Sequence, residues 1–232
     1  MMRKLFILLV LLSLSSFLYS EGITDLIDCP TANVVEYGGY DLNFRLYQPK
    51  DEGENGFLTR LFFGVLPHIN LGIFFDTQNL IGKGNIKLRR PRMYFKFQLF
   101  SSQIENYIPA VAFGYEDQGY GAYTDGNYEQ REKGIYLVVS QPSLIPAGQV
   151  HVGINLYEFD DPFVRGFVGV SLPLGDEFIP LFEYDNLGEG SESRLNIGVR
   201  YQIVPNLHIE IAGRDIVNTT ERILRIEYKG NF

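Results

Sequence analysis

The sequence predicts an all-β protein: a transmembrane, antiparallel, up-and-down β-barrel of about twelve strands. Three observations predict this fold. Segments of about 8 to 11 residues alternate apolar with polar side chains, as expected of strands whose two faces meet different surroundings. The connections between these segments alternate between long and short. The last segment ends the chain on an aromatic residue, Phe232.

The first six expected strands alternate apolar or aromatic residues with polar ones. In the first, Tyr40 and Phe44 alternate with Asp41 and Arg45. The other five show the same period of two, which places one set of side chains on each face. The six segments are 39–47, 57–65, 69–76, 91–100, 108–115 and 134–141.

The last six expected strands continue the pattern to the end of the chain. The most regular is the tenth, in which Leu195 and Ile197 alternate with Asn196 and Arg200. Each segment is close to the length that crosses a bilayer at a tilt. The six segments are 150–156, 163–172, 178–184, 194–201, 207–211 and 224–232.

The connections predict how the barrel is oriented. Six are long and polar: 48–56, 77–90, 116–133, 158–162, 185–193 and 215–220. Five are short, and all but 101–107 contain proline: 66–68, 101–107, 142–147, 173–177 and 204–206. This requires an even strand number with both termini at the short-turn end, as in outer-membrane barrels. A soluble sandwich or propeller also has many short strands, but it does not account for this asymmetry.

The final strand carries four apolar residues on one face, namely Leu224, Ile226, Tyr228 and Phe232. They resemble the C-terminal insertion signal of bacterial outer-membrane barrels. The resemblance implies the bacterial outer membrane as the location. It also implies outer-membrane lipid, lipopolysaccharide and the barrel-assembly machinery as partners.

The N-terminus predicts export. Arg3 and Lys4 precede an apolar run and several serines, so residues 1–20 are interpreted as a signal peptide; an uncleaved anchor is the alternative. Residues 21–36 are expected to be a short periplasmic segment that caps or partly plugs the barrel mouth, and residues 37–232 the barrel. Cys29 is the only cysteine, which excludes an internal disulfide; lipidation of its thiol is the alternative to a free thiol.

The charge excludes one class of partner. The net charge is −8 and becomes −10 without Arg3 and Lys4, so nucleic acid, which needs basic surfaces, is excluded as a partner. After residue 20 no apolar run approaches the roughly 18 residues of a membrane-spanning helix.

The charged faces of the strands are expected to line the lumen. The expected basic residues are Arg45, Arg60, Lys96, Arg165, Arg194, Arg200, Arg214, Arg225 and Lys229. The expected acidic residues are Asp41, Glu183, Glu210 and Glu227. Two interpretations remain open. Arginine and glutamate pair and fill a narrow barrel, or the nine-to-four excess of positive charge creates a path for anions. The acids of the long loops are expected to be solvated.

The sequence favours a protein that is not an enzyme, without cofactors or metal sites. The only nearby Ser–His pair is Ser140 and His151, which are expected to be diagonal neighbours on adjacent strands. An activated serine also needs an acid that orients the histidine, and the sequence offers none beside this pair.

Three stretches resemble the YjbH-like group of outer-membrane barrels, which is linked to exopolysaccharide production. They are Thr31 to Val35 leading into Tyr40–Tyr47, Pro109–Gly114 followed by Gln118–Gly121, and Leu195–Tyr201. The resemblance implies a role in polysaccharide export or maintenance of the envelope. The expected function is passage of an anionic solute or acidic polysaccharide. The alternatives are a closed structural barrel and, last, an outer-membrane lipid hydrolase.

Overall fold

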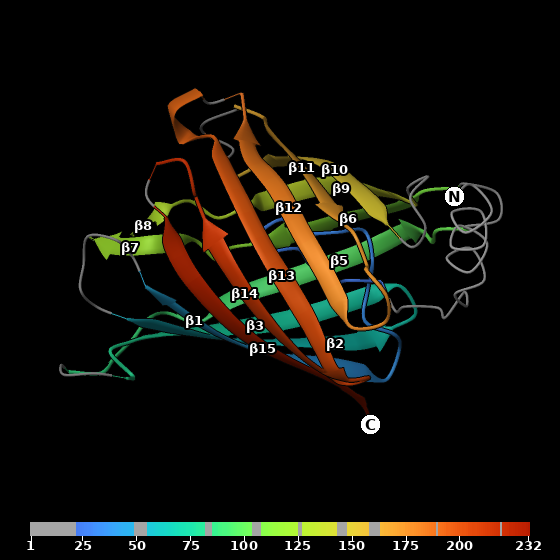
Figure 1. The fold of residues 1–232 in the computed structure, drawn as a ribbon, viewed down its shortest axis with the longest axis horizontal. Coiled ribbons are helices and arrows are strands. Elements are labelled where there is room, and N and C mark those ends of the chain that lie inside the picture. The colour runs from blue at the N-terminus through green and yellow to red at the C-terminus, as the bar shows by residue number, and fades with distance from the viewer. Residues whose placement is uncertain are drawn as a thin grey trace, which may run out of the picture.

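A computed structural model describes residues 22–48, 55–81, 85–103, 108–124, 127–142, 148–157, 163–188, 190–218 and 220–232. Twelve antiparallel strands form a closed barrel (Figure 1). They are β1 (Gly39–Gln48), β2 (Gly56–Leu66), β3 (Ile69–Gln78), β5 (Arg92–Phe100), β6 (Ala110–Glu116), β9 (Gly134–Pro142), β10 (Gln149–Leu156), β11 (Arg165–Ser171), β12 (Phe178–Leu187), β13 (Arg194–Val204), β14 (Leu207–Arg214) and β15 (Glu221–Asn231). The predicted fold class is confirmed, and the predicted signal peptide lies outside the described residues.

The first and last strands close the barrel. β1 pairs with β15 from Gly39 opposite Asn231 to Gln48 opposite Arg222. At the short-turn end, the Phe232 ring lies 5.1 Å from that of Tyr40 and 6.2 Å from that of Phe63. The terminal aromatic residue therefore packs across the closure from β15 onto β1 and β2.

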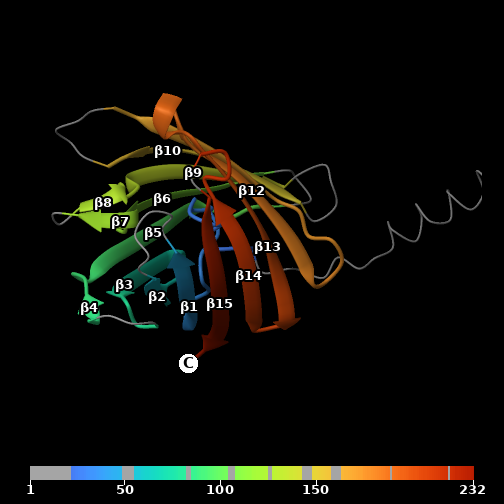
Figure 2. The ribbon, with the colours of Figure 1, turned by 60° about the vertical axis from the view of Figure 1, so that its left-hand side comes forward.

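Four small elements were not predicted, and all belong to the long connections. β4 (Lys87–Leu88) pairs with the end of β3. β7 (Tyr120–Thr124) and β8 (Asn127–Gln130) form a separate hairpin, which lies at the end away from the C-terminus (Figures 1 and 2). A short 3-10 turn, Gly190–Glu192, follows β12.

Burial in the barrel is the reverse of that in a soluble protein. Along β15, Arg225 and Glu227 are 0% and 1% exposed, whereas Leu224, Ile226 and Tyr228 are 39–41% exposed. An apolar outer face and a polar interior are the arrangement of a barrel in lipid. Among the described residues there is no helix long and apolar enough to cross a membrane.

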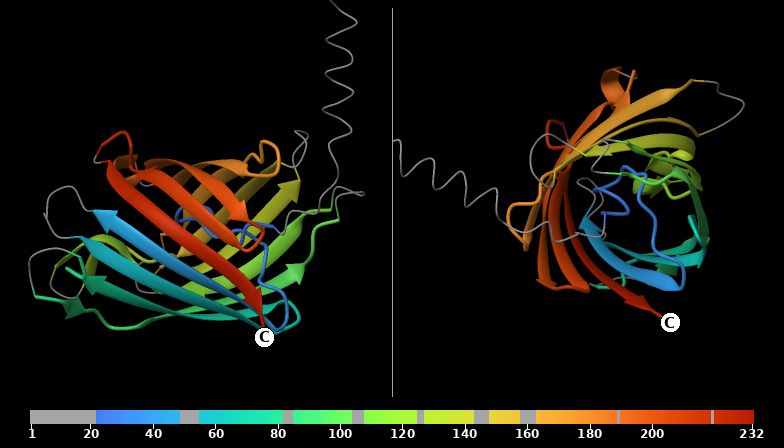
Figure 3. Two further views of the ribbon diagram at one scale, coloured as in Figure 1. Left: turned by 60° about the horizontal axis from the view of Figure 1, so that its bottom comes forward. Right: turned by 90° about the vertical axis from the view of Figure 1, so that its right-hand side faces the viewer.

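The N-terminal segment (residues 22–38) runs inside the ring of strands, as the end-on view shows (Figure 3). Leu26, Ile27, Cys29 and Ala32 are 0% exposed. The segment was expected to cap or partly plug the mouth of the barrel, but it reaches further, to side chains midway along the strands. The interior of the barrel is therefore filled by a part of the chain that precedes its first strand.

The exposed apolar face predicts a depth-dependent cost of charge. Ile226 lies midway along β15 and is 41% exposed, whereas Asn231 ends the same strand. We expect Ile226→Arg to lower the unfolding free energy in lipid bilayers by about 2–4 kcal/mol, and Asn231→Arg by at most about 1 kcal/mol. Urea unfolding followed by circular dichroism measures both. Equal effects would contradict a lipid-facing surface here.

Candidate functional site

Five neighbouring strands each place one arginine in the interior. These residues, called the arginine belt below, are Arg200 (β13), Arg214 (β14), Arg225 (β15), Arg45 (β1) and Arg60 (β2). Their exposed fractions are 0–2%. The strand alternation explains their placement, because each occupies an inward-facing position of its strand. Five neighbouring strands of the twelve in the barrel thus each carry a buried guanidinium group.

The strand register brings like charges together within the belt. Arg45 lies directly opposite Arg225 on the adjacent strand. On β14, Glu210 lies between two belt residues: it is opposite Arg225 of β15 on one side and Arg200 of β13 on the other. Like charges directly opposite each other destabilise a sheet, and a buried charge without a partner costs several kcal/mol. The belt therefore requires more negative charge than Glu210 alone can supply.

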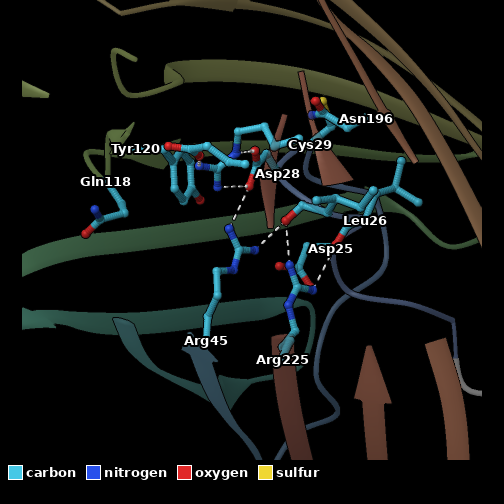
Figure 4. A network of polar contacts seen from close by, with 12 residues as sticks. Asp25, Leu26, Asp28, Cys29, Arg45, Gln118, Tyr120, Asn196 and Arg225 are labelled. Carbon is cyan, nitrogen blue, oxygen red and sulfur yellow. Dashed lines mark hydrogen bonds and ion pairs between the residues drawn. The ribbon is translucent and has the colours of Figure 1, made fainter. Parts of the chain in front are cut away.

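Asp28 of the N-terminal segment supplies part of that charge (Figure 4). Its Oδ1 atom lies 2.6 Å from Arg45 Nη1 and accepts a hydrogen bond of 2.9 Å from Arg214 Nη2. Its Oδ2 atom accepts a further bond from Arg214 Nε. This two-bond contact with one guanidinium is the geometry in which arginine holds a carboxylate most strongly.

Asp25, three residues before Asp28, supplies a second carboxylate. It pairs with Arg60 through Oδ2, and its Oδ1 atom lies 3.6 Å from Arg225 Nη1. Burial alone would raise the pKa of Asp25, but the guanidinium groups of Arg60, Arg225 and Arg200 hold that pKa well below its usual range. Asp25 therefore adds a second negative charge from the segment beside the belt.

Backbone carbonyl groups between these two carboxylates complete the contacts. The Ile27 carbonyl accepts hydrogen bonds from both Arg45 Nη2 and Arg225 Nη2. The Leu26 carbonyl accepts one of 2.9 Å from Arg225 Nη1, and the Asp25 carbonyl one of 3.1 Å from Arg200 Nη2. Four successive residues of the segment thus present oxygen atoms to the belt.

The other wall of the barrel holds the opposite side of the segment. Glu183 on β12 accepts hydrogen bonds of 3.1 Å from the amides of Ile27, Asp28 and Cys29. Lys96 on β5 donates to the carbonyl groups of Thr24, at 2.7 Å, and Asn33, at 2.8 Å. The carbonyl groups of the segment therefore accept hydrogen bonds from cationic side chains, and three of its backbone amides donate to the Glu183 carboxylate.

Two glycines in the wall make room for the apolar side chains of the segment. A Cβ atom at Gly169 would lie 2.1 Å from Leu26 Cδ1, and one at Gly198 would lie 3.2 Å from Ile27 Cδ1. Both side chains belong to one buried apolar cluster with Phe167. The inner surface of the barrel therefore matches the shape of this segment as well as its charge.

The β7–β8 hairpin contacts the belt at the long-loop end. The Tyr120 ring lies 4.5 Å from the Arg214 guanidinium carbon and 5.2 Å from that of Arg45. The Tyr120 hydroxyl donates a hydrogen bond of 2.9 Å to Glu116. Arg45 and Arg214 thus contact Asp28 of the segment and the aromatic face of Tyr120.

The other residues expected to line the lumen have more local partners. Arg165 is 4% exposed and lies 3.9 Å from the ring of Tyr157. Arg194 is half-buried and opposite Asp185. Asp41 accepts a hydrogen bond of 3.3 Å from Thr24.

Glu227 is buried at the short-turn side of the belt. It lies 3.3 Å from Arg200 and 3.2 Å from Lys229. A cavity of about 180 Å³ is lined by Lys229, Glu36, Tyr40 and other residues at this mouth.

The buried charges of the barrel are more balanced than the nine-to-four excess expected from the strand faces. Nine basic side chains are buried among the described residues: Arg45, Arg60, Arg89, Lys96, Lys133, Arg165, Arg200, Arg214 and Arg225. Eleven acidic ones are buried with them: Asp25, Asp28, Asp41, Asp76, Glu116, Glu183, Asp185, Glu210, Asp215, Glu221 and Glu227. The strand pattern could not assign acids from the N-terminal segment and the loops. Two of these acids, Asp25 and Asp28, do have a sign in the sequence, because they belong to the acidic stretch that precedes the first strand.

Two loop acids that were expected to be solvated are in fact buried. Glu116 is 1% exposed and lies 3.8 Å from Arg60, and Asp185 is 5% exposed and pairs with Lys133. Burial removes these carboxylates from water, so each requires a nearby cation.

Ser140 and His151 are directly opposite each other rather than diagonal. Ser140 Oγ lies 2.8 Å from His151 Nδ1, and His151 Nε2 lies 3.3 Å from Ser171 Oγ. Ser140 Oγ also accepts a hydrogen bond of 2.8 Å from the Ala32 amide, so this pair anchors the N-terminal segment. The part of the chain that the structure describes contains no group of three His, Cys, Asp or Glu residues arranged to hold a metal ion.

Solved structures share the fold of this chain. It is similar to the KdgM porin, with 11% identity, a TM-score of 0.56, and coverage of 81% of this chain and 98% of the porin. The KdgM porin in complex with disordered oligogalacturonate gives a TM-score of 0.54 at the same identity and coverage. No protein-family model matches the chain, and no curated protein matches its sequence. The likeness shows a shared β-barrel fold.

The ion pairs of Asp28 predict how stability depends on pH. Burial alone would raise the pKa of Asp28, but Arg214 and Arg45 hold it well below its usual range. A lowered folded-state pKa means that the stabilisation is complete above the unfolded value, about 3.9, and is lost as the pH falls from there through the folded value. We expect Asp28→Asn to lower the unfolding free energy by about 3 kcal/mol at pH 7.

Urea unfolding of wild-type and variant barrels between pH 8 and pH 2 measures this difference. It should be constant above about pH 5 and shrink below about pH 3.9. Asp176→Asn, in the exposed turn after β11, is the matched control and should change stability by less than about 0.5 kcal/mol. A difference between wild type and Asp28→Asn that vanished between pH 7 and pH 5 would contradict the lowered pKa.

Proposed function

We propose that this protein is a bacterial outer-membrane barrel through which an anionic solute passes, with an acidic envelope glycan or exopolysaccharide as the solute class. The observation that carries the proposal is the arginine belt. Replacing buried ion pairs by packed apolar residues is often neutral or stabilising, so a barrel that needed only a filled interior would gain little from five buried arginines. Rows of arginine favour anions in pores.

The position of Arg45 opposite Arg225 strengthens this proposal. The pair is unfavourable without a counter-charge and favourable around one. Carboxylate and carbonyl oxygens of the chain itself occupy the space beside the pair. The belt is therefore suited to bind carboxylate-bearing chains.

The resemblances support the choice of solute. The KdgM porin has been solved with oligogalacturonate, an acidic glycan, and shares this fold. The resemblance of three stretches to the YjbH-like group adds a link to exopolysaccharide. Outer-membrane lipid and lipopolysaccharide would contact the apolar outer face, and the barrel-assembly machinery would bind the terminal strand that ends at Phe232.

A closed structural barrel is the second candidate function, and a specific observation favours it. The belt is 0–2% exposed, and Gly169 and Gly198 fit the apolar residues of the segment. In that case the interior would serve stability alone, and the long loops would carry the function. The two candidates differ in whether the N-terminal segment ever leaves the lumen.

Planar-bilayer conductance distinguishes the two functions. We expect the wild-type barrel to be closed most of the time, because the N-terminal segment fills the lumen. Asp25→Asn with Asp28→Asn removes the charges that hold the segment, and should raise the open fraction by about tenfold or more, given about 1.4 kcal/mol per tenfold. The current should be anion-selective.

A second pair of variants checks the role of the belt in that current. Adding Arg45→Ser and Arg225→Ser to the aspartate variants should abolish the anion selectivity. A heat-dependent gel shift confirms that each barrel is folded. Folded aspartate variants that stay silent, or that pass cations, would overturn the proposed passage of anions.

A further inference from the structure

The N-terminal segment has the features of a bound ligand. Two carboxylates, three residues apart, lie at two places on the belt: Asp28 against Arg45 and Arg214, and Asp25 against Arg60. The carbonyl groups between them accept further hydrogen bonds from the belt. The segment thus behaves as a short polyanion lying along the belt.

The segment does not use the full donor capacity of the belt. The Nε atoms of Arg45, Arg60 and Arg225 are buried and have no hydrogen-bond partner among the described residues. An unsatisfied buried donor is costly, and each guanidinium has five N–H groups in a planar fork. A ligand with more carboxylate oxygens could therefore satisfy the belt better than two aspartates can.

We propose that residues 22–38 are a tethered ligand of the arginine belt, and that a chain bearing several carboxylates displaces them by binding to the same arginines. This inference rests on the proposed function and adds how the passage opens. The segment stays attached to β1, so it competes at a high effective concentration. A free ligand must therefore engage several arginines at once to displace it.

The attachment of the segment also limits ligand affinity in a measurable way. A site that is free for only a fraction of the time binds its ligand more weakly by that fraction. Weakening the segment without changing the belt should therefore tighten the apparent binding of a polyanion. Gly169 offers such a change, because a side chain there would collide with Leu26 and not with the belt.

Cys29 provides the measurement. It is the only cysteine in the chain and is 0% exposed beside the belt contacts. Its rate of modification by a maleimide-linked polymer therefore reports how often the segment leaves the lumen. We would measure this rate on the purified, folded barrel with oligogalacturonate as the probe, and with a neutral maltooligosaccharide at equal ionic strength as the control.

The expected result has three parts. Oligogalacturonate accelerates modification of wild-type Cys29 by about tenfold or more, and the neutral sugar leaves it unchanged. Gly169→Leu raises the rate without probe and lowers the oligogalacturonate concentration needed for half of the maximal rate, as a larger free fraction of the site requires. Gly166→Leu, on the outer face of the same strand, changes neither quantity.

A belt variant tests whether the probe acts through the arginines. In the variant Arg45→Ser with Arg225→Ser, Cys29 should be modified faster without probe, because the segment loses contacts with the belt. Oligogalacturonate should no longer change that rate. An equal response in this variant would overturn the proposal, because the probe would then act elsewhere. Folding of each variant is confirmed by circular dichroism and the gel shift.

The outcomes separate this inference from the proposed function. If oligogalacturonate accelerates the modification of Cys29 but no current is seen in bilayers, the inference of a tethered ligand stands and the proposed passage of anions is overturned. If an anion current is seen but oligogalacturonate does not accelerate the modification of Cys29, the proposed passage of anions stands and the displacement of the segment by a ligand is overturned. Wild-type Cys29 that reacts as fast in the folded barrel as in the urea-unfolded chain would overturn the inference outright, because the segment would not occupy the lumen.

Discussion

The structure depends on one electrostatic constraint: five guanidinium groups from neighbouring strands are buried in the interior of the barrel. Removing such charges from water costs several kcal/mol each, even after relaxation, and only nearby anions with good geometry offset that cost. Glu210 and Glu227 on the strands supply two of these anions. Asp25 and Asp28 supply two more from outside the barrel sequence. The N-terminal segment is therefore part of what makes the barrel stable.

The same constraint explains why the interior has two different walls. The arginines of the belt occupy β13, β14, β15, β1 and β2, whereas the opposite strands carry Lys96 and Glu183 together with small and apolar residues such as Ala110, Val138 and Gly169. A segment between these walls must present oxygen atoms to the belt, and both apolar side chains and backbone polar groups to the opposite wall. Residues 25–28 do so, with Leu26 against Gly169 and the two aspartates against the belt.

Strand alternation made the wall of the barrel predictable. A slip by one residue would place every charge of a strand in lipid, so the positions of Arg45, Arg200 and Arg225 followed from their apolar neighbours. The contents of the lumen could not be predicted in this way. Asp28 bonds to Arg214, 186 residues later, and the N-terminal segment has no period that indicates which surface it contacts. The register Arg45–Arg225 also depends on barrel closure, which no local pattern specifies.

The closure between β1 and β15 has a consequence for biogenesis. The segment continues directly into β1, and the Phe232 amide bonds to the Gly38 carbonyl at 2.9 Å, where the segment meets the strand. The residue that completes the ring of strands is thus fastened to the base of the segment inside it. Because β1 pairs with β15, the ring can be completed only after β15 has been synthesised. The N-terminal segment is therefore made before the ring that surrounds it can close, and its attachment at Gly38 keeps it at the mouth of the closed barrel.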